Sequence, residues 1–377
     1  MVKEANKTFV YGVSVEGSNF TDRVKESRRL KMNFENGLNV VLISPRRMGK
    51  TSLVKHVREI VDSSMIQTVY VDIYDCRSEY DFYNKFAEAL LKQTASKMEL
   101  ALENVKRFLV RLTPKVAFSP DLASEYSFSL GITPKEYSPE EILSLPEILA
   151  KHIGKHIVVC IDEFQQIGEW PDSIYVQKRM RGVWQHQQHV SYCLFGSRQH
   201  MMTNIFQNKR MPFYQFGEPN YLQPIPTADW IPFIQGKFIE KGLSISEECV
   251  TMICDIVRNQ SSYVQQLAWN VMLNADTEVT EETIQQGVRD LLDQCTPLFM
   301  EQLNSLTTYQ MNFLRAIVSG IHQDFGEREI REGYDLGSSS NIARLKKALI
   351  SKDLVDTDGK RLTITDPVFS IWFKRKG

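Results

Sequence analysis

The sequence predicts an α/β fold with a parallel sheet, followed by a helical region and a small C-terminal domain. Three observations predict it: four short apolar runs are typical of buried strands, helical patterns alternate with them, and the strand pattern stops after residue 226. A chain of 377 residues suggests two or three domains. With 42 % hydrophobic and 24 % charged residues, it has enough apolar material to fill their cores.

The four predicted strands are nearly continuous in hydrophobicity, which suits parallel strands covered by helices on both faces. They occupy residues 39–44, 68–74, 156–162 and 191–197. Helical patterns occupy residues 51–64, 79–112, 139–154 and 176–188. Because strands and helices alternate in this order, we expect a doubly wound α/β layer.

The pattern changes twice after this layer. Residues 227–295 have a helical pattern alone, and helices from residue 296 onward precede a hairpin signal at Asp358-Gly359. Helices followed by a hairpin are typical of a winged helix. Residues 113–138 hold three prolines and many serines, which indicates an irregular insertion. The predicted domains are 1–226 (with the insertion at about 76–138), 227–295 and 296–377.

Composition and charge narrow the functional class. The net charge of −1 gives no overall attraction to polyanions, so nucleic-acid binding would have to come from a local patch. No apolar run approaches the roughly 18 residues that a membrane span needs, and the N-terminal residues lack the apolar stretch of a secretory signal. The six cysteines are scattered without a C-x-x-C pair. We therefore expect a cytoplasmic protein with no membrane segment.

The segment SPRRMGKTS has the features of a phosphate-binding loop. It follows an apolar run and precedes an amphipathic helix, as such a loop must. In this motif the backbone N–H groups surround the phosphates, which assigns Lys50 to the β- and γ-phosphates and Thr51 to Mg²⁺. Ser44 replaces the usual leading glycine, and G-K-T alone is a weak signal, but its context favours an intact site. The predicted nucleotide contacts here are Ser44, Pro45, Arg46, Arg47, Met48, Gly49, Lys50, Thr51 and Ser52.

A second motif lies at the end of the buried run HIVVCID, where Glu163 follows Asp162. In a Walker B arrangement, the first carboxylate lies beside Mg²⁺ and the second polarises the attacking water. Two solvated acids at a strand end are the structural alternative, but the upstream loop and the intervening α/β pattern favour the functional reading. We predict Asp162 as a metal residue and Glu163 as the catalytic base.

A third candidate follows the run YCLFG. Ser197, or Arg198 after it, could lie near the γ-phosphate, since both come at the end of a strand expected beside the Walker B strand. Gly196-Ser197 would equally make an ordinary helix N-cap. Both interpretations stay open, and Ser197 is carried forward as a catalytic candidate.

Together these residues resemble the archaeal-type ATPase family, which groups with the STAND and AAA+-like P-loop ATPases. The family loop G-x-R-R-x-G-K-T-S-L is matched by SPRRMGKTSL, and the likeness extends to IDEFQ, FGS, PFYQFG and the terminal DPVFSIWF. The segment FTDRVKESRRL is similar to the family's h-x-x-R-x-x-E motif near the adenine, which implies Asp22 and Arg23 as base-side contacts. The resemblance implies a P-loop NTPase core of the ASCE and AAA+-like kind, a helical lid and a winged helix.

The resemblance also implies a function. ATP and Mg²⁺ are the expected cofactors, and hydrolysis is expected to drive a conformational switch that involves a protein partner or self-association. Two features depart from the family pattern: Ser44 in the loop, and a lid segment RNQSSYVQQLAW that keeps Tyr263 and Gln265 but lacks the family's proline.

Two other functions stay open. The first is a DNA-associated ATPase, because the segment 338–354 occupies the recognition-helix position of a winged helix and carries Arg344, Lys346 and Lys347. Residues 305–377 have a net charge of only +3, which supports DNA binding weakly. The second is a nucleotide-binding scaffold with negligible hydrolysis.

Four arginines have two interpretations each. Arg46 and Arg47 could contact phosphates or a neighbouring subunit, or form a solvated pair on the loop. Arg179 and Arg181 could act as arginine fingers across an interface, but ordinary charge on a helix surface is the favoured interpretation.

Overall fold

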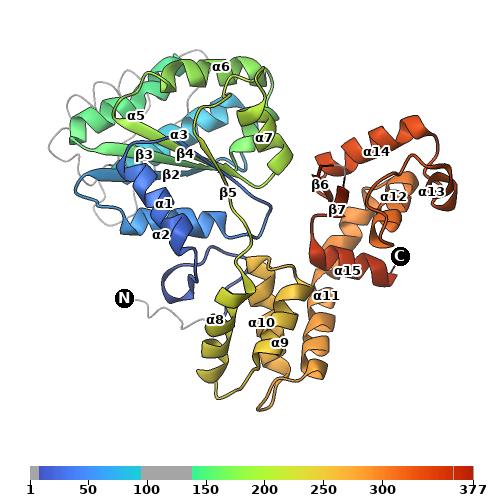
Figure 1. The fold of residues 1–377 in the computed structure, drawn as a ribbon. Helices are drawn as coiled ribbons and strands as arrows, with labels where there is room; N and C mark the ends of the chain where they lie inside the picture. The colour runs from blue at the N-terminus through green and yellow to red at the C-terminus, as the bar shows by residue number, and fades with distance from the viewer. Residues whose placement is uncertain (1–7, 95–137, 360, 377) are drawn as a thin grey trace, which may run out of the picture. The chain divides into compact units, whose positions relative to one another are not determined.

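The computed structural model describes residues 8–94, 138–359 and 361–376 (Figure 1). The irregular insertion expected at 113–138 lies outside the described residues, apart from Ser138. The chain forms two compact units. The core unit comprises residues 23–46 and 50–223, and the C-terminal unit comprises the described residues up to 22 together with 47–49 and 224–377.

The core unit is built on a five-stranded sheet in the order β2-β3-β4-β1-β5, and its strands pair in parallel. The strands are β1 (Val40–Ile43), β2 (Ile66–Asp72), β3 (His156–Asp162), β4 (Val190–Gly196) and β5 (Glu218–Tyr221). The first four confirm the predicted strands. In a parallel sheet the carboxyl ends of the strands lie at one edge, so the segments after β1, β3 and β4 are brought together.

The fifth strand, β5, was not predicted. Glu218 N donates to Asn39 O at 2.8 Å and Leu222 N donates to Ile43 O at 2.9 Å, which pairs β5 with β1. Backbone N–H groups alternate in direction along a strand, so Pro219 occupies a position that points away from β1. The missing N–H of Pro219 therefore removes no bond from the β1–β5 ladder.

Helices cover both faces of this sheet, with α1 and α2 on one face and α3, α5 and α6 on the other (Figure 1). This arrangement confirms the doubly wound layer. The helices are α1 (Val24–Glu35), α2 (Lys50–Ile60), α3 (Glu79–Thr94), α5 (Pro139–Ile153), α6 (Ser173–Trp184) and α7 (Gln199–Gln207), with a short 3₁₀ turn η3 (Phe164–Gly168) after β3. The helix expected at 79–112 is described only as far as Thr94.

The turn η3 is anchored in the core of the sheet. Phe164 is fully buried and stacks on Phe206 at 5.6 Å between ring centroids. It also meets Phe213 edge to face at 5.4 Å. Because Phe164 follows Glu163 directly, this packing fixes where the chain carries the Glu163 side chain.

The C-terminal unit is helical apart from one hairpin. Its elements are η1 (Gly17–Asn19), α8 (Thr227–Ile239), α9 (Glu247–Ile256), α10 (Ser261–Asn274), α11 (Glu281–Asn304), α12 (Thr308–Val318), α13 (Arg328–Gly333), α14 (Ser339–Ser351), β6 (Val355–Asp358), β7 (Arg361–Ile364) and α15 (Pro367–Lys376). The strands β6 and β7 pair antiparallel, which confirms the hairpin predicted at Asp358-Gly359.

The long helix α11 runs across the boundary expected between residues 295 and 296. Its Phe299 packs on Phe369 at 5.2 Å and on Trp372 at 5.4 Å, and Trp372 Nε1 donates to Thr296 Oγ1 at 2.8 Å. The last turns of α11 therefore pack with the C-terminal helix α15. No helix among the described residues is long and apolar enough to cross a membrane.

Candidate functional site

The predicted phosphate loop connects β1 to α2. Gly49 has a φ of +83° and leads directly into α2, where Lys50 is the first residue. Ser44 is not among the described residues with a positive φ, so its position requires no glycine. The departure from the family pattern at Ser44 is therefore compatible with the backbone of the loop.

The side chain of Lys50 is buried and turned back onto its own loop. Its Nζ donates to Ser44 O at 2.9 Å, Ser44 Oγ at 3.2 Å and Pro45 O at 2.8 Å. Burial lowers the pKa of Lys50 to about 8, although the carboxylates of Glu163 and Asp162 oppose that shift. An anion bound in the loop would give this lysine the compensating charge that its carbonyl partners do not supply.

The other predicted loop residues differ in exposure. Met48 and Ser52 are buried, whereas Arg46 is exposed. Arg47 clusters with the C-terminal unit, where its guanidinium donates to Asp366 Oδ2 at 2.6 Å and lies over the ring of Tyr263 at 4.5 Å. The interpretation of Arg47 as a solvated charge is therefore wrong, and its contact with phosphate stays a prediction.

Thr51 and Asp162 lie in direct contact. Thr51 Oγ1 donates to Asp162 Oδ2 at 2.8 Å, which joins the start of α2 to the end of β3. Asp162 is 5 % exposed, and burial raises the pKa of its carboxyl to about 6 while hydrogen bonds from Thr51 and Tyr70 oppose the rise. Oxygen ligands from one hydroxyl and one carboxylate fit Mg²⁺, which takes few protein ligands and completes its shell with phosphates and water.

Tyr70 belongs to this group and was missed by the sequence reasoning. Its hydroxyl donates to Asp162 Oδ2 at 2.8 Å from the neighbouring strand β2. The guanidinium of Arg58 lies 5.5 Å from the centre of its ring. No local sequence signal marks Tyr70, because its contact with Asp162 depends on the register between β2 and β3.

Glu163 lies at the end of β3 with a left-handed backbone, at φ 54° and ψ 38°. Its Oε2 accepts hydrogen bonds from Ser197 Oγ at 3.1 Å and from Gln165 Nε2. The structure thus brings two of the predicted catalytic residues, Glu163 and Ser197, into contact. Arg198, the alternative to Ser197, is instead paired with Glu169.

Arg23, a predicted base-side contact, directly precedes α1. Its guanidinium donates to Gln223 O at 2.6 Å and to Glu26 at 2.9 Å, and the residue is 2 % exposed. The arginine and glutamate of the h-x-x-R-x-x-E motif therefore pair with each other. Asp22, the other base-side prediction, shares a positive φ with Arg23. The roles of both toward adenine stay predictions.

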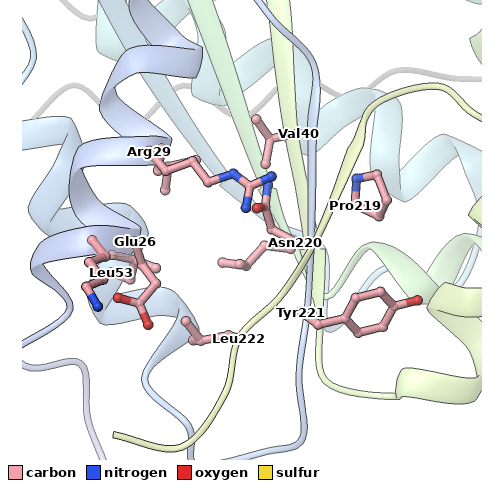
Figure 2. A pocket seen from close by; sticks show the side chains of 11 residues that line it. Glu26, Arg29, Val40, Leu53, Pro219, Asn220, Tyr221 and Leu222 are labelled. Atoms are coloured by element: carbon pink, nitrogen blue, oxygen red, sulfur yellow. The ribbon is translucent and has the colours of Figure 1, made fainter.

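A pocket of about 200 Å³ lies in the core unit between α1, α2, β1 and β5 (Figure 2). Its floor is apolar and its rim carries charged and amide groups. The lining residues are Lys25, Glu26, Arg29, Leu30, Val40, Leu42, Leu53, Pro219, Asn220, Tyr221 and Leu222. None of the predicted phosphate, metal or catalytic residues is among them.

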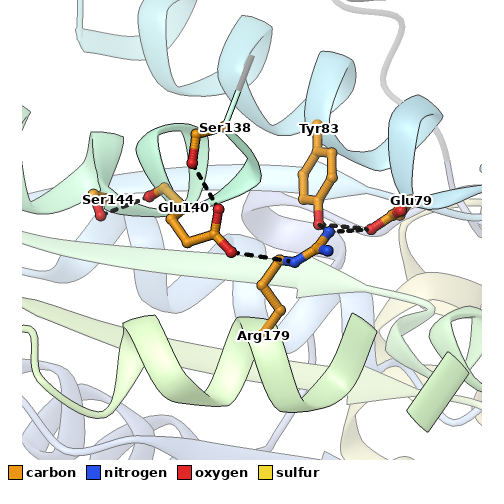
Figure 3. Close-up of polar contacts among 6 residues, drawn as sticks. All are labelled: Glu79, Tyr83, Ser138, Glu140, Ser144 and Arg179. Atoms are coloured by element: carbon orange, nitrogen blue, oxygen red, sulfur yellow. Dashed lines mark hydrogen bonds and ion pairs between the residues drawn. The ribbon is translucent and has the colours of Figure 1, made fainter. Parts of the chain in front are cut away.

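Arg179 joins three helices and is not an exposed charge (Figure 3). It donates to Glu79 Oε2 at 2.8 Å on α3 and pairs with Glu140 at 3.3 Å on α5, from its own place on α6. Its guanidinium also lies over the ring of Tyr175 at 4.7 Å. Arg181 lies over the ring of Phe216 at the same distance. The favoured interpretation of these two arginines as helix-surface charge was therefore wrong, because each has a partner within the core unit.

Comparisons with known proteins show which folds this chain resembles. Residues 297–375 match the family model described as "Probable winged helix domain". No curated protein matches the sequence. The Walker-type ATPase of Pyrococcus abyssi is 16 % identical at a TM-score of 0.71, covering 98 % of this chain and 100 % of that one. The ORC2 protein of Aeropyrum pernix, in its ADPNP–ADP complexes, is 14 % identical at a TM-score of 0.59, covering 99 % and 98 %. The ORC1 protein of the same organism, in complex with DNA, is 12 % identical at a TM-score of 0.50, covering 95 % and 94 %.

These likenesses confirm the predicted fold class. The chain has the parallel-sheet α/β core of P-loop ATPases and a C-terminal winged-helix domain. The predicted resemblance to archaeal-type ATPases is thereby confirmed at the level of the fold.

Proposed function

We propose that this protein binds ATP with Mg²⁺, hydrolyses it and uses the hydrolysis as a conformational switch. The contact that carries the proposal is the 2.8 Å hydrogen bond from Thr51 Oγ1 to Asp162 Oδ2. Thr51 follows the loop lysine, Lys50, and Asp162 precedes the candidate base, so this hydrogen bond joins the two motifs. The sheet topology alone brings both segments to one edge, and the direct contact of a hydroxyl with a carboxylate there is what supports a shared cation site.

Each residue of the site has a distinct task in this proposal. Lys50 neutralises charge on the β- and γ-phosphates. Thr51 and Asp162 would hold Mg²⁺, which would supply positive charge to offset the negative charge of the phosphates. Glu163 orients a water molecule and takes its proton. Ser197 holds the Glu163 carboxylate through the 3.1 Å hydrogen bond to its Oε2.

Turnover tests the proposal directly. Purified protein should release phosphate from ATP in the presence of Mg²⁺, and excess chelator should abolish the release because Thr51 and Asp162 then hold no cation. Nucleotide binding without release at any Mg²⁺ concentration would contradict hydrolysis. That outcome would favour the nucleotide-binding scaffold.

The DNA-associated alternative depends on helix α14. Arg344 and Lys347 are exposed there, while Leu345 and Leu349 are buried against the domain core. This is the amphipathic arrangement of a helix that could face a groove, and the ORC1 likeness comes from a complex with DNA. A net charge of +3 over residues 305–377 is nevertheless small for a DNA-binding domain.

We expect only weak duplex binding at physiological salt. A fluorescence titration should give a dissociation constant above about 1 µM at about 0.15 M salt. The logarithm of the binding constant should fall only slowly with the logarithm of the salt concentration, since each phosphate contact adds about 0.9 to the magnitude of that slope. Tighter binding that is lost when Arg344, Lys346 and Lys347 are all replaced by alanine would instead establish the DNA-associated function. Arg328→Ala, an exposed arginine on α13, is the matched control.

A further inference from the structure

Gln165 lies two residues after Glu163 and is 2 % exposed. Its side-chain Nε2 donates to Glu163 Oε2. Within the described part of the chain, its Oε1 is buried and has no hydrogen-bond partner. A buried acceptor without a partner destabilises a fold, because it loses water and gains nothing in exchange. A buried amide with an unpaired oxygen lowers stability, and a residue of this kind is typical of a functional position.

The end of β4 is shaped around this amide. A Cβ atom on Gly196 would lie 1.8 Å from Gln165 Oε1 and 3.0 Å from its Cδ. Gly196 is not among the described glycines with a positive φ, so the backbone itself does not require glycine there. What this position requires is the absence of a side chain, which leaves room for the Gln165 amide.

The two donors converge on one oxygen of the carboxylate. Ser197 Oγ and Gln165 Nε2 both donate to Glu163 Oε2, and among the described residues no donor contacts Oε1. The left-handed backbone of Glu163 is unfavourable for a residue with a Cβ atom, and the buried Phe164 beside it holds the turn in place. The carboxylate is therefore fixed through Oε2, while Oε1 is left to accept a proton.

We propose that Gln165 is a positioning residue for ATP hydrolysis and that Gly196 provides the space it needs. The inference rests on the proposed function, in which Glu163 is the base. Water gives a proton to Glu163 Oε1 as its oxygen bonds to the terminal phosphorus, and the bond from that phosphorus to the bridging oxygen breaks with its electron pair going to ADP. Gln165 touches neither water nor phosphate and acts by holding the other oxygen of Glu163.

The first test replaces the amide by an apolar side chain of similar size. Gln165→Met should lower kcat about tenfold or more while the Mg·ATP dissociation constant stays within about twofold, because a misdirected base affects only the chemical step. Its Tm should stay the same or rise, since the unpaired Oε1 is removed. Gln166→Met is the matched control: that neighbouring side chain donates to Tyr74 O and should leave kcat unchanged.

The second test uses the packing of Gly196 against Gln165. Gly196→Ala should lower kcat in the wild-type background, because its Cβ displaces the amide. In a Gln165→Ala background the same change should add less, since the overlap with the Gln165 amide is gone and only the contact with Met202 Sδ at 3.0 Å remains, so the two effects are not additive. Additive losses, or wild-type kcat in Gln165→Met, would overturn the inference and leave the proposed function standing. Absence of turnover in the wild-type protein would overturn both.

Discussion

Replacing Glu163 by glutamine is expected to lower the rate of ATP hydrolysis about a hundredfold or more while Mg·ATP still binds. The amide oxygen can still accept the hydrogen bonds from Ser197 and Gln165, so the side chain should keep its place. What is lost is the negative charge that polarises water. Phosphate release and Mg·ATP affinity, measured in parallel, separate the two effects.

Asp162→Asn is the matched comparison for Glu163→Gln. It removes charge one residue earlier, from the carboxylate that contacts Thr51 and Tyr70. This variant should weaken the Mg²⁺-dependent part of ATP affinity, whereas Glu163→Gln should not. Wild-type turnover in Glu163→Gln would show that this strand end is not the catalytic Walker B, and the protein would then be a nucleotide-binding protein alone.

Lys50→Ala is expected to remove most of the ATP affinity. The buried ammonium is the main positive charge of the loop, and a charge-assisted contact of this kind is worth about 1.5–3 kcal/mol, or roughly 10- to 100-fold in the dissociation constant. A fluorescent ATP analogue titrated against both proteins measures the loss. Equal affinities would mean that the G-K-T sequence is a chance match.

The same lysine gives the affinity a dependence on pH. Its pKa of about 8 in the free protein means that it loses its proton as the pH rises through that value. Phosphates bind the charged form, so binding above pH 8 must take up a proton and affinity should fall by up to about tenfold per pH unit. Lys50→Ala, which has no such proton to gain, should lack this slope.

The parts of the fold that the sequence predicted are those whose signal is local. Three of the four apolar runs became the interior strands β1, β3 and β4, which are hydrophobic enough to be buried on both faces, and the fourth became the edge strand β2. The edge strand β5 has no such run: Glu218, Pro219, Asn220 and Tyr221 form a strand because β1 offers its free backbone edge. That pairing is a tertiary contact, which composition does not encode.

The residues of the candidate site likewise include some that local motifs identify and one that only a tertiary contact identifies. Lys50, Thr51, Asp162 and Glu163 belong to contiguous motifs and could be named in advance. Tyr70 could not, since its contact with Asp162 depends on the register between β2 and β3.

Arg179 was misjudged for a similar reason. Its partners Glu79 and Glu140 lie on two other helices, and only the packing of α3, α5 and α6 brings their carboxylates within reach. A charge on a helix has the same sequence pattern whether it meets solvent or another helix.

Pro219 has a consequence for how copies of this chain could assemble. Among the described strands, β5 ends the sheet, and an unpaired edge is a template on which a strand from another molecule can add. At Pro219 that edge lacks a donor, so an incoming strand would leave one of its carbonyl groups without a partner. The β5 edge is thereby a poor template for a strand from another molecule. Any self-association at this edge in the ATP-bound state is expected to use side-chain surfaces, and it should be reversible on hydrolysis because no continuous backbone ladder forms there.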